Sequence, residues 1–149
     1  MMKIRKYNIP DYVDVAGPAS EDKILVAERE LGVKFPSEYR EFLKKYGAIA
    51  VAPYQIAGIF DWDETEPSLW DHVVYFTKRK RHTLGEYLPK NLIYLSHDGM
   101  ETTFYLDCSP EHAGRVIAMG PEIGERVVAE SFGEFLEKIL KDEDPVGDL

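Results

Sequence analysis

Carboxylates and tryptophans are concentrated in one segment near the middle of the sequence, between positions 61 and 71. The carboxylates are Asp61, Asp63, Glu64, Glu66 and Asp71, and the tryptophans between them are Trp62 and Trp70. One interpretation is a contact surface for a basic protein, because tryptophans anchor interfaces and carboxylates match Lys and Arg. The alternative is an acidic loop whose tryptophans pack into the core, and the residues taken singly favour it. A calcium loop is a third interpretation, but the glycine and terminal glutamate spacing of an EF-hand is absent.

The histidines and the cysteine offer little catalytic chemistry. No H-x-x-x-H or H-E-x-x-H spacing on a helix links His72, His82, His97 and His112. His97 precedes the turn residues Asp98 and Gly99, which favours a structural role at a strand end. Cys108 shares one face of a predicted strand with Phe104 and Leu106, which indicates a buried small apolar residue and not a nucleophile.

No phosphate-binding glycine loop or nucleophile-elbow serine is present either. The sequence therefore predicts no catalytic residue, no metal site and no cofactor.

A basic run, KRKRH, occupies positions 78–82. It could contact nucleic acid, or it could be the solvated end of a helix, where cations are favoured by the helix dipole. The whole chain has 27 Asp and Glu against 18 Lys and Arg, a net charge of -9. Because phosphate binding requires surplus cations, this balance favours the helix end and argues against direct nucleic-acid binding. It is compatible with a basic protein partner.

Composition points to an ordinary globular protein. The chain has 149 residues, 44% of them hydrophobic and 30% charged, which suits one domain with its own core. A single cysteine excludes an internal disulfide and fits a reducing compartment. The N-terminal residues lack the apolar run of a secretory signal, and no segment has the apolar length of a membrane span. We therefore expect a cytoplasmic protein without a membrane association.

Periodicity and capping residues predict the first elements. A helix is expected over 20–31, capped by Ser20, with Ile24, Ala27, Glu28 and Leu31 on one face. Gly32 ends it. A second helix is expected over 37–46, where aromatic and leucine side chains recur at helical spacing. The chain from 48 to 60 reads as strand interrupted near position 53, and Ser68 is expected to cap a third helix.

The second half reads as a strand meander followed by a helix. Strands over 92–97 and 101–108 flank Asp98-Gly99, a strong signal for a two-residue hairpin turn. That turn would place Ile93 opposite Phe104 and Leu95 opposite Thr102. Two further strands, GRVIAMG and GERVVAE, precede a helix over 131–141 with a capping-box sequence.

These elements indicate an α+β fold in one domain, 1–149, with a central antiparallel sheet flanked by about four helices. The core should span about residues 20–140, with a short N-terminal extension and an acidic C-terminal tail.

The order and spacing of several patterns carry a family resemblance. They are LGVKFPSEYREFLKKYG, LPKNLIYLSHDG, FYLDCSP, GRVIAMG and SFGEFLEKIL. In this order they resemble the SUKH superfamily, which includes yeast cell-wall assembly regulators and many bacterial toxin-immunity proteins. None of these patterns is catalytic, and together they cover about residues 20–140.

The resemblance implies a non-enzymatic binding domain. It implies an immunity protein that neutralises a cognate polymorphic toxin, often a nuclease, by binding it. The alternative that it leaves open is a regulatory interaction module comparable to the cell-wall regulators. Because binding surfaces in the family vary with the partner, no contact residue carries over. With the resemblance added, the segment 61–71 becomes the first choice for partner contact, and the exposed face of the hairpin around Tyr94, Glu101 and Tyr105 is the second.

Overall fold

The computed structural model describes residues 9–147 and confirms an α+β fold. The helices are α1 (Glu21–Leu31), α2 (Ser37–Tyr46), α3 (Val73–Leu84) and α4 (Phe132–Leu140), with a 3-10 turn η1 (Gly85–Tyr87) after α3. The strands are β1 (Asp14–Val15), β2 (Ile49–Val51), β3 (Tyr54–Ile56), β4 (Leu92–His97), β5 (Thr103–Asp107), β6 (Val116–Gly120) and β7 (Gly124–Ala129). The helices expected over 20–31, 37–46 and 131–141 are confirmed within one residue at each end.

The strands form two antiparallel sheets where the sequence predicted one. The first has the order β1-β2-β3 and the second the order β4-β5-β6-β7. The backbone N–H of Ala57, just after β3, donates to the carbonyl of Leu95 in β4 at 2.8 Å. This bond joins the end of the small sheet to the edge of the large one. The residues before α1, expected only as an extension, contribute β1 to the small sheet.

Glu28 fixes the connection between α1 and α2. Its carboxylate is buried and accepts a hydrogen bond from the backbone N–H of Phe35 at 2.7 Å, and a second at 3.3 Å from Arg40 of α2. Ser20 caps α1, and Gly32 ends it in the left-handed conformation, as predicted. A carboxylate on the apolar face of α1 therefore holds the loop that leads into α2.

The register predicted for the hairpin was wrong. Ile93 pairs with Leu106, not Phe104, and the pairing shifts between Tyr94 and Ser96, so that Leu95 lies at a bulge. The cause is a longer loop: the Asp98 carboxylate accepts from the backbone N–H groups of both Met100 and Thr102. That Asx-type turn closes a wider connection than a two-residue turn would, and it displaces the register by three residues next to the loop and by two beyond the bulge.

The start predicted for the third helix was also wrong. The Ser68 hydroxyl accepts from the N–H of Trp70 at 3.1 Å and forms only a local turn. The helix begins at Val73, and its cap is His72, whose Nδ1 accepts from the N–H of Val74 at 3.3 Å.

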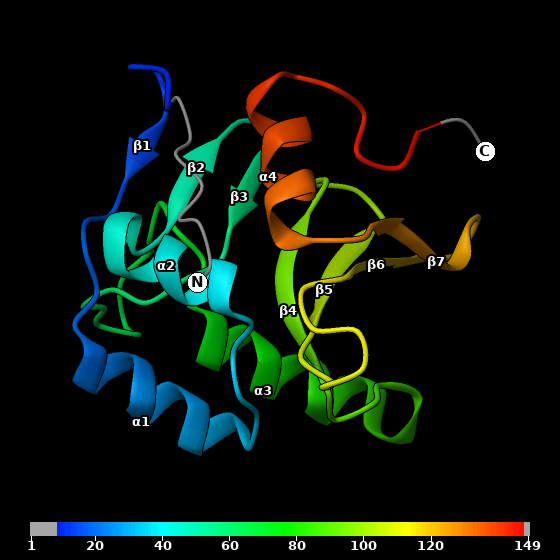
Figure 1. Cartoon of the computed structure of the whole chain (residues 1–149), viewed down its shortest axis with the longest axis horizontal. Helices are drawn as coiled ribbons and strands as arrows, with labels where there is room; N and C mark the ends of the chain where they lie inside the picture. Colours follow the sequence, from blue (N-terminus) through cyan, green and yellow to red (C-terminus); the bar gives the residue numbers. More distant parts are fainter. Residues whose placement is uncertain (1–8, 148–149) are drawn as a thin grey trace.

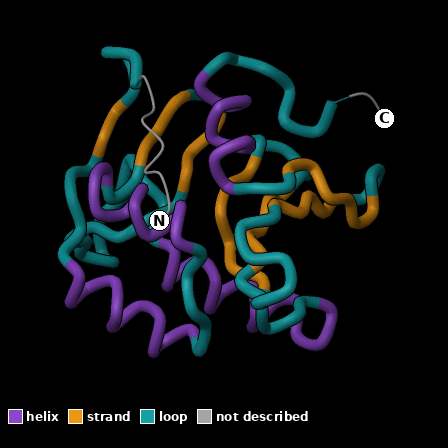
Figure 2. The backbone as a smooth tube through the Cα atoms, in the orientation of Figure 1, coloured by secondary structure: helices purple, strands orange, loops and turns teal. Residues whose placement is uncertain are grey.

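The helices pack in two pairs. In Figure 1, α1 runs beside α3 and α2 lies beside α4; α3 packs on β4 and α4 on β7, while α1 contacts the other helices. Rings of Phe42 in α2 and Phe132 in α4 meet at 5.2 Å between centroids, inside the main hydrophobic core. Figure 2 shows that long loops connect these elements, including the one that precedes α3. Within residues 9–147, no helix has the length and apolar character needed to cross a bilayer.

Candidate binding site

The acidic segment is a loop whose base is fixed. Gly58 donates its backbone N–H to the carbonyl of Asp71 at 3.0 Å and accepts from the N–H of Val73 at 2.9 Å. Only glycine fits at position 58, because a Cβ there would lie 1.6 Å from the carbonyl oxygen of Gly47. Both ends of the loop are therefore fixed to each other by backbone hydrogen bonds, and the residues between them extend from this base.

The first four carboxylates of the loop are exposed: Asp61, Asp63, Glu64 and Glu66. Asp61 forms an ion pair with Lys23 of α1, and that hydrogen-bonded ammonium lowers the pKa of the carboxyl group. Asp63 accepts from the backbone N–H of Thr65, which lowers its pKa as well. Within the described part of the chain, Asp63, Glu64 and Glu66 have no ion-pair partner. The loop therefore presents negative charge to solvent.

Trp62 is half-buried and held in place. Its indole N–H donates to the carbonyl of Glu66 at 2.9 Å, and its ring meets Tyr75 of α3 edge-on at 5.0 Å. Phe60 lies on its other side at 6.3 Å. The Trp62 side chain thus packs against α3 and forms part of the surface there, and it does not project into solvent.

Trp70 ties the loop to the small sheet. Its indole N–H donates to the carbonyl of Asp14 in β1 at 3.1 Å, and its ring lies 5.8 Å from Phe60. Part of each tryptophan remains accessible, so the structure combines both interpretations of these residues.

Asp71 does not share the exposed surface. It is buried, accepts from the Tyr94 hydroxyl at 2.7 Å, and lies 3.7 Å from Nε2 of His97. Asp71 is therefore a buried hydrogen-bond acceptor between the loop and β4, and among the predicted contact residues of the segment 61–71 it is the one that is withdrawn from solvent.

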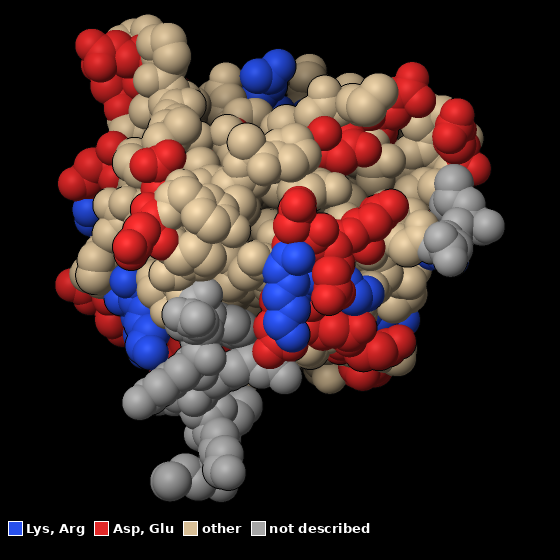
Figure 3. Space-filling model, turned by 90° about the horizontal axis from the view of Figure 1, so that it is seen from above, with Lys and Arg blue, Asp and Glu red and all other residues tan. Residues whose placement is uncertain are grey.

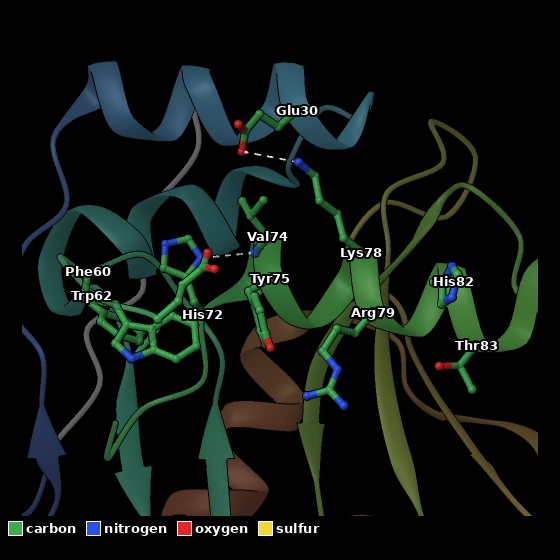
Figure 4. Close-up of a pocket in the computed structure, with 11 residues that line it drawn as sticks. Glu30, Phe60, Trp62, His72, Val74, Tyr75, Lys78, Arg79, His82 and Thr83 are labelled. Atoms are coloured by element: carbon green, nitrogen blue, oxygen red, sulfur yellow. Dashed lines mark hydrogen bonds and ion pairs between the residues drawn. The ribbon is translucent and has the colours of Figure 1, made fainter. Parts of the chain in front are cut away.

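A groove lies between α1 and α3, next to the acidic loop. It consists of two adjoining cavities of about 570 and 300 Å³, which share Glu30, Phe60, His72 and Val74. Figure 4 shows the larger one: Trp62, His72 and Tyr75 gather at one end, Glu30 and Lys78 face each other, and His82 and Thr83 lie farther along α3. We call the two cavities together the α1–α3 groove.

The groove has aromatic walls and charged rims. Arg79 lies over the ring of Tyr75, 5.7 Å from its centroid, and Lys78 lies 3.9 Å from the carboxylate of Glu30. His72 packs at 5.3 Å from Phe60, and burial lowers the pKa of its imidazole. Aromatic rings beside carboxylates and a guanidinium group can contact both apolar and charged parts of a peptide.

The basic run expected at a helix end is part of α3. Arg81 donates to the carbonyl of Lys90 at 3.0 Å, while Lys78 and Arg79 face the groove. The run therefore lies in the last turns of a helix, as predicted, and Lys78, Arg79 and Arg81 in addition contact other groups of the fold.

The exposure expected at the second-choice contact surface was wrong for its two tyrosines, although Glu101 is exposed. Tyr94 and Tyr105 are each only 1% exposed, so the hairpin presents neither ring to a partner. The alternation of side chains along the strands suggested one exposed face. In the structure both faces are buried, because α3 and α4 pack on the sheet and a second, smaller hydrophobic cluster forms around Leu92 and Ile117.

On the face of the molecule shown in Figure 3, Asp and Glu make up more of the charged surface than Lys and Arg do. Among residues 9–147, no three His, Cys, Asp or Glu side chains are grouped so as to hold a metal ion. Cys108 was predicted to be buried, but the side chain is only partly buried. Its desolvation still raises the pKa of the thiol to about 12, which opposes a nucleophilic role.

The sequence did not reveal the groove, because it depends on α1 and α3 lying side by side. Glu30 and Phe60 had no pattern that marked them. The helical pattern that predicted α3 could have marked Tyr75, because Tyr75 lies one position from the face of the helix that packs on β4.

Comparison with known proteins supplies a family. The model of a family described as the SMI1/KNR4 family (SUKH-1) matches residues 18–138, from just before α1 to within α4. A search of curated proteins found no match.

Proposed function

Because this chain belongs to the SMI1/KNR4 family (SUKH-1), we propose that it is a non-enzymatic immunity protein that binds and neutralises a cognate polymorphic toxin. The toxin that best fits its charge is a nuclease. A nuclease displays Lys and Arg to hold phosphate, and an inhibitor of net charge -9 can compete for those cations. The chain would act in the cytoplasm, where such a toxin reaches nucleic acid.

The observation that supports this proposal is the exposed acidic loop on a fixed base. Asp63, Glu64 and Glu66 project without an ion-pair partner among the described residues, beside the aromatic wall formed by Trp62 and Tyr75. Carboxylates of this kind accelerate association with a basic surface, and aromatic groups that become buried slow dissociation. Neutralisation would then follow from occlusion of the toxin's substrate-binding surface.

The test is binding and protection. The chain should form a stoichiometric complex with the C-terminal domain of the toxin encoded directly upstream, and its co-expression should relieve the toxicity of that domain. Absence of an upstream toxin gene, together with capture of the chain in a complex of the cell's own proteins, would favour the regulatory interaction module instead. A toxin domain that neither binds nor loses toxicity would contradict the proposal.

A further inference from the structure

We propose that the α1–α3 groove binds an arginine or lysine of the toxin together with an adjacent apolar side chain. This inference rests on the proposed function and adds to it the place and chemistry of the contact. It moves the centre of the interface from the outer edge of the acidic loop to the groove behind it.

The floor of the groove accounts for the apolar part of the ligand. Ala27, Ile59 and Val74 line it beside Phe60, and Val26 at its rim is 44% exposed. Ala27, Ile59 and Val74 are each at most 8% exposed, so the apolar surface that an aliphatic side chain would remove from water belongs mainly to Val26 and the half-buried Phe60.

The charges around the groove account for the cation. Each cation on its rim that belongs to α1 or to the middle of α3 already has a neighbour in the chain: Lys23 has Asp61, Lys78 has Glu30 and Arg79 has the ring of Tyr75. Two carboxylates on the rim, Asp22 and Glu64, have no ion pair with another described residue. The Tyr75 ring is neutral and leaves the charge of Arg79 in place, so two unpaired carboxylates face one unpaired cation. The remaining charge of the groove is therefore negative by one, and a cation from outside complements it.

The chain itself shows how the aromatic wall binds such a group. The guanidinium of Arg79 lies 5.7 Å from the Tyr75 ring centroid, within the range of a cation–π contact. Trp62 meets that same ring edge-on and extends the wall toward Glu64. A second guanidinium, from the toxin, would find an aromatic ring and a free carboxylate in the same place.

Two neighbouring residues of α1 give a matched steric test. Val26 and Leu25 are both 44% exposed, but Val26 lines the groove, whereas Leu25 lies on the other side of the helix, beside Arg29 and Gly32. Val26→Trp should therefore weaken binding to the toxin domain at least tenfold, and Leu25→Trp should change it less than twofold. Both variants are first compared with the wild type by urea unfolding.

A matched pair in the loop tests the charge. Glu64 lines the groove and Glu66 does not, although both are exposed. Glu64→Gln should raise the dissociation rate at least fivefold, and Glu66→Gln should leave it within twofold.

The outcomes separate this inference from the proposed function. If the wild type binds the toxin domain and Val26→Trp binds as well as Leu25→Trp, the groove is not the contact and the proposed function stands. If the wild type fails to bind, both are overturned. If the chain alone is dimeric and only Val26→Trp makes it monomeric, the groove binds a second copy and the inference is overturned.

Discussion

The hydroxyl of Tyr94 donates a hydrogen bond of 2.7 Å to the carboxylate of Asp71, and both side chains are buried. This contact joins the end of the acidic loop to the middle of β4. Together with the Gly58 backbone bonds, it holds the loop against the large sheet. The exposed carboxylates of the acidic loop are thus held in position by Asp71, an acidic residue that does not itself face the solvent.

Tyr94→Phe should lower the free energy of unfolding by about 1.5–3 kcal/mol, because the buried Asp71 carboxylate then loses the hydroxyl group that donates a hydrogen bond to it. Urea unfolding monitored by circular dichroism measures this. Tyr12→Phe is the control, since Tyr12 is 67% exposed and should cost almost nothing. Equal effects of the two substitutions would show that the bond contributes little.

Glu28→Ala should destabilise the chain by about 1–3 kcal/mol, because the backbone N–H of Phe35 would remain buried without an acceptor. Glu38→Ala, in the first turn of α2, provides a comparison at a carboxylate without this backbone contact. The same urea titration measures both. An unfolding midpoint unchanged by Glu28→Ala would show that water replaces the carboxylate.

Local signals predicted α1, α2 and α4, because their caps and apolar faces are set by residues three or four positions apart. The apolar face of α1 even included Glu28, although only the folded chain shows why a carboxylate belongs there. The hairpin register failed because the side chain of Asp98 selects a longer loop than its Asp-Gly pair suggests.

The candidate site was predictable in composition but not in shape. Clustered charge marked the acidic loop correctly as exposed over its first part. The position of Trp70 depends on Asp14, far away in the sequence, and the groove depends on the packing of α1 beside α3. Contacts of this kind have no local pattern. Sequence analysis therefore could not tell that Trp62 lines the groove, that Trp70 bonds to β1 and that Asp71 is buried.

Stability should fall as the pH is lowered below about 6.5, in part through His72. Burial lowers the pKa of its imidazole in the folded chain, so the unfolded chain binds a proton first as the pH falls. The stability that neutral His72 contributes is therefore complete above the unfolded pKa and is lost as the pH falls toward the folded pKa. Protonation of Nδ1 would also remove the cap on Val74.

His72→Asn keeps a capping acceptor and removes this titration, so it should flatten the dependence of unfolding free energy on pH between 7.5 and 5.5. The exposed His112 serves as the control, and His112→Asn should leave the wild-type slope in place. A slope that His72→Asn does not change would assign the pH dependence to other groups.

Cys108 should react slowly with thiol reagents while the chain is folded. Burial, aided by the neighbouring Asp107 carboxylate, raises the thiol pKa to about 12, so little thiolate is present at pH 8. We expect alkylation by iodoacetamide to be at least ~100-fold slower in buffer than in urea, since the thiolate is the reacting form. Met100→Cys in a Cys108→Ser background supplies an exposed thiol for comparison, as Met100 is 88% exposed. Similar rates for the two thiols in buffer would contradict the burial argument.

The exposed charge of the acidic loop should govern how fast the toxin domain is bound. Replacing Asp63, Glu64 and Glu66 by their amides removes three carboxylates that have no ion-pair partner among the described residues and leaves the Asp61–Lys23 pair intact. The association rate should fall about tenfold at low salt, and its dependence on ionic strength should become weaker, because steering acts through the screened field.

A second triple variant separates the position of the charges from their number. Glu111, Glu122 and Glu125 are exposed and lie in the β5–β6 loop and around the β6–β7 turn, outside the acidic loop and the groove. Their replacement by Gln changes the net charge by the same amount. If net charge alone attracts the toxin, both triples will slow association equally. If the acidic loop faces the incoming cations, only the first will, and the difference will disappear at high salt, where charges separated by more than a few ångströms no longer interact.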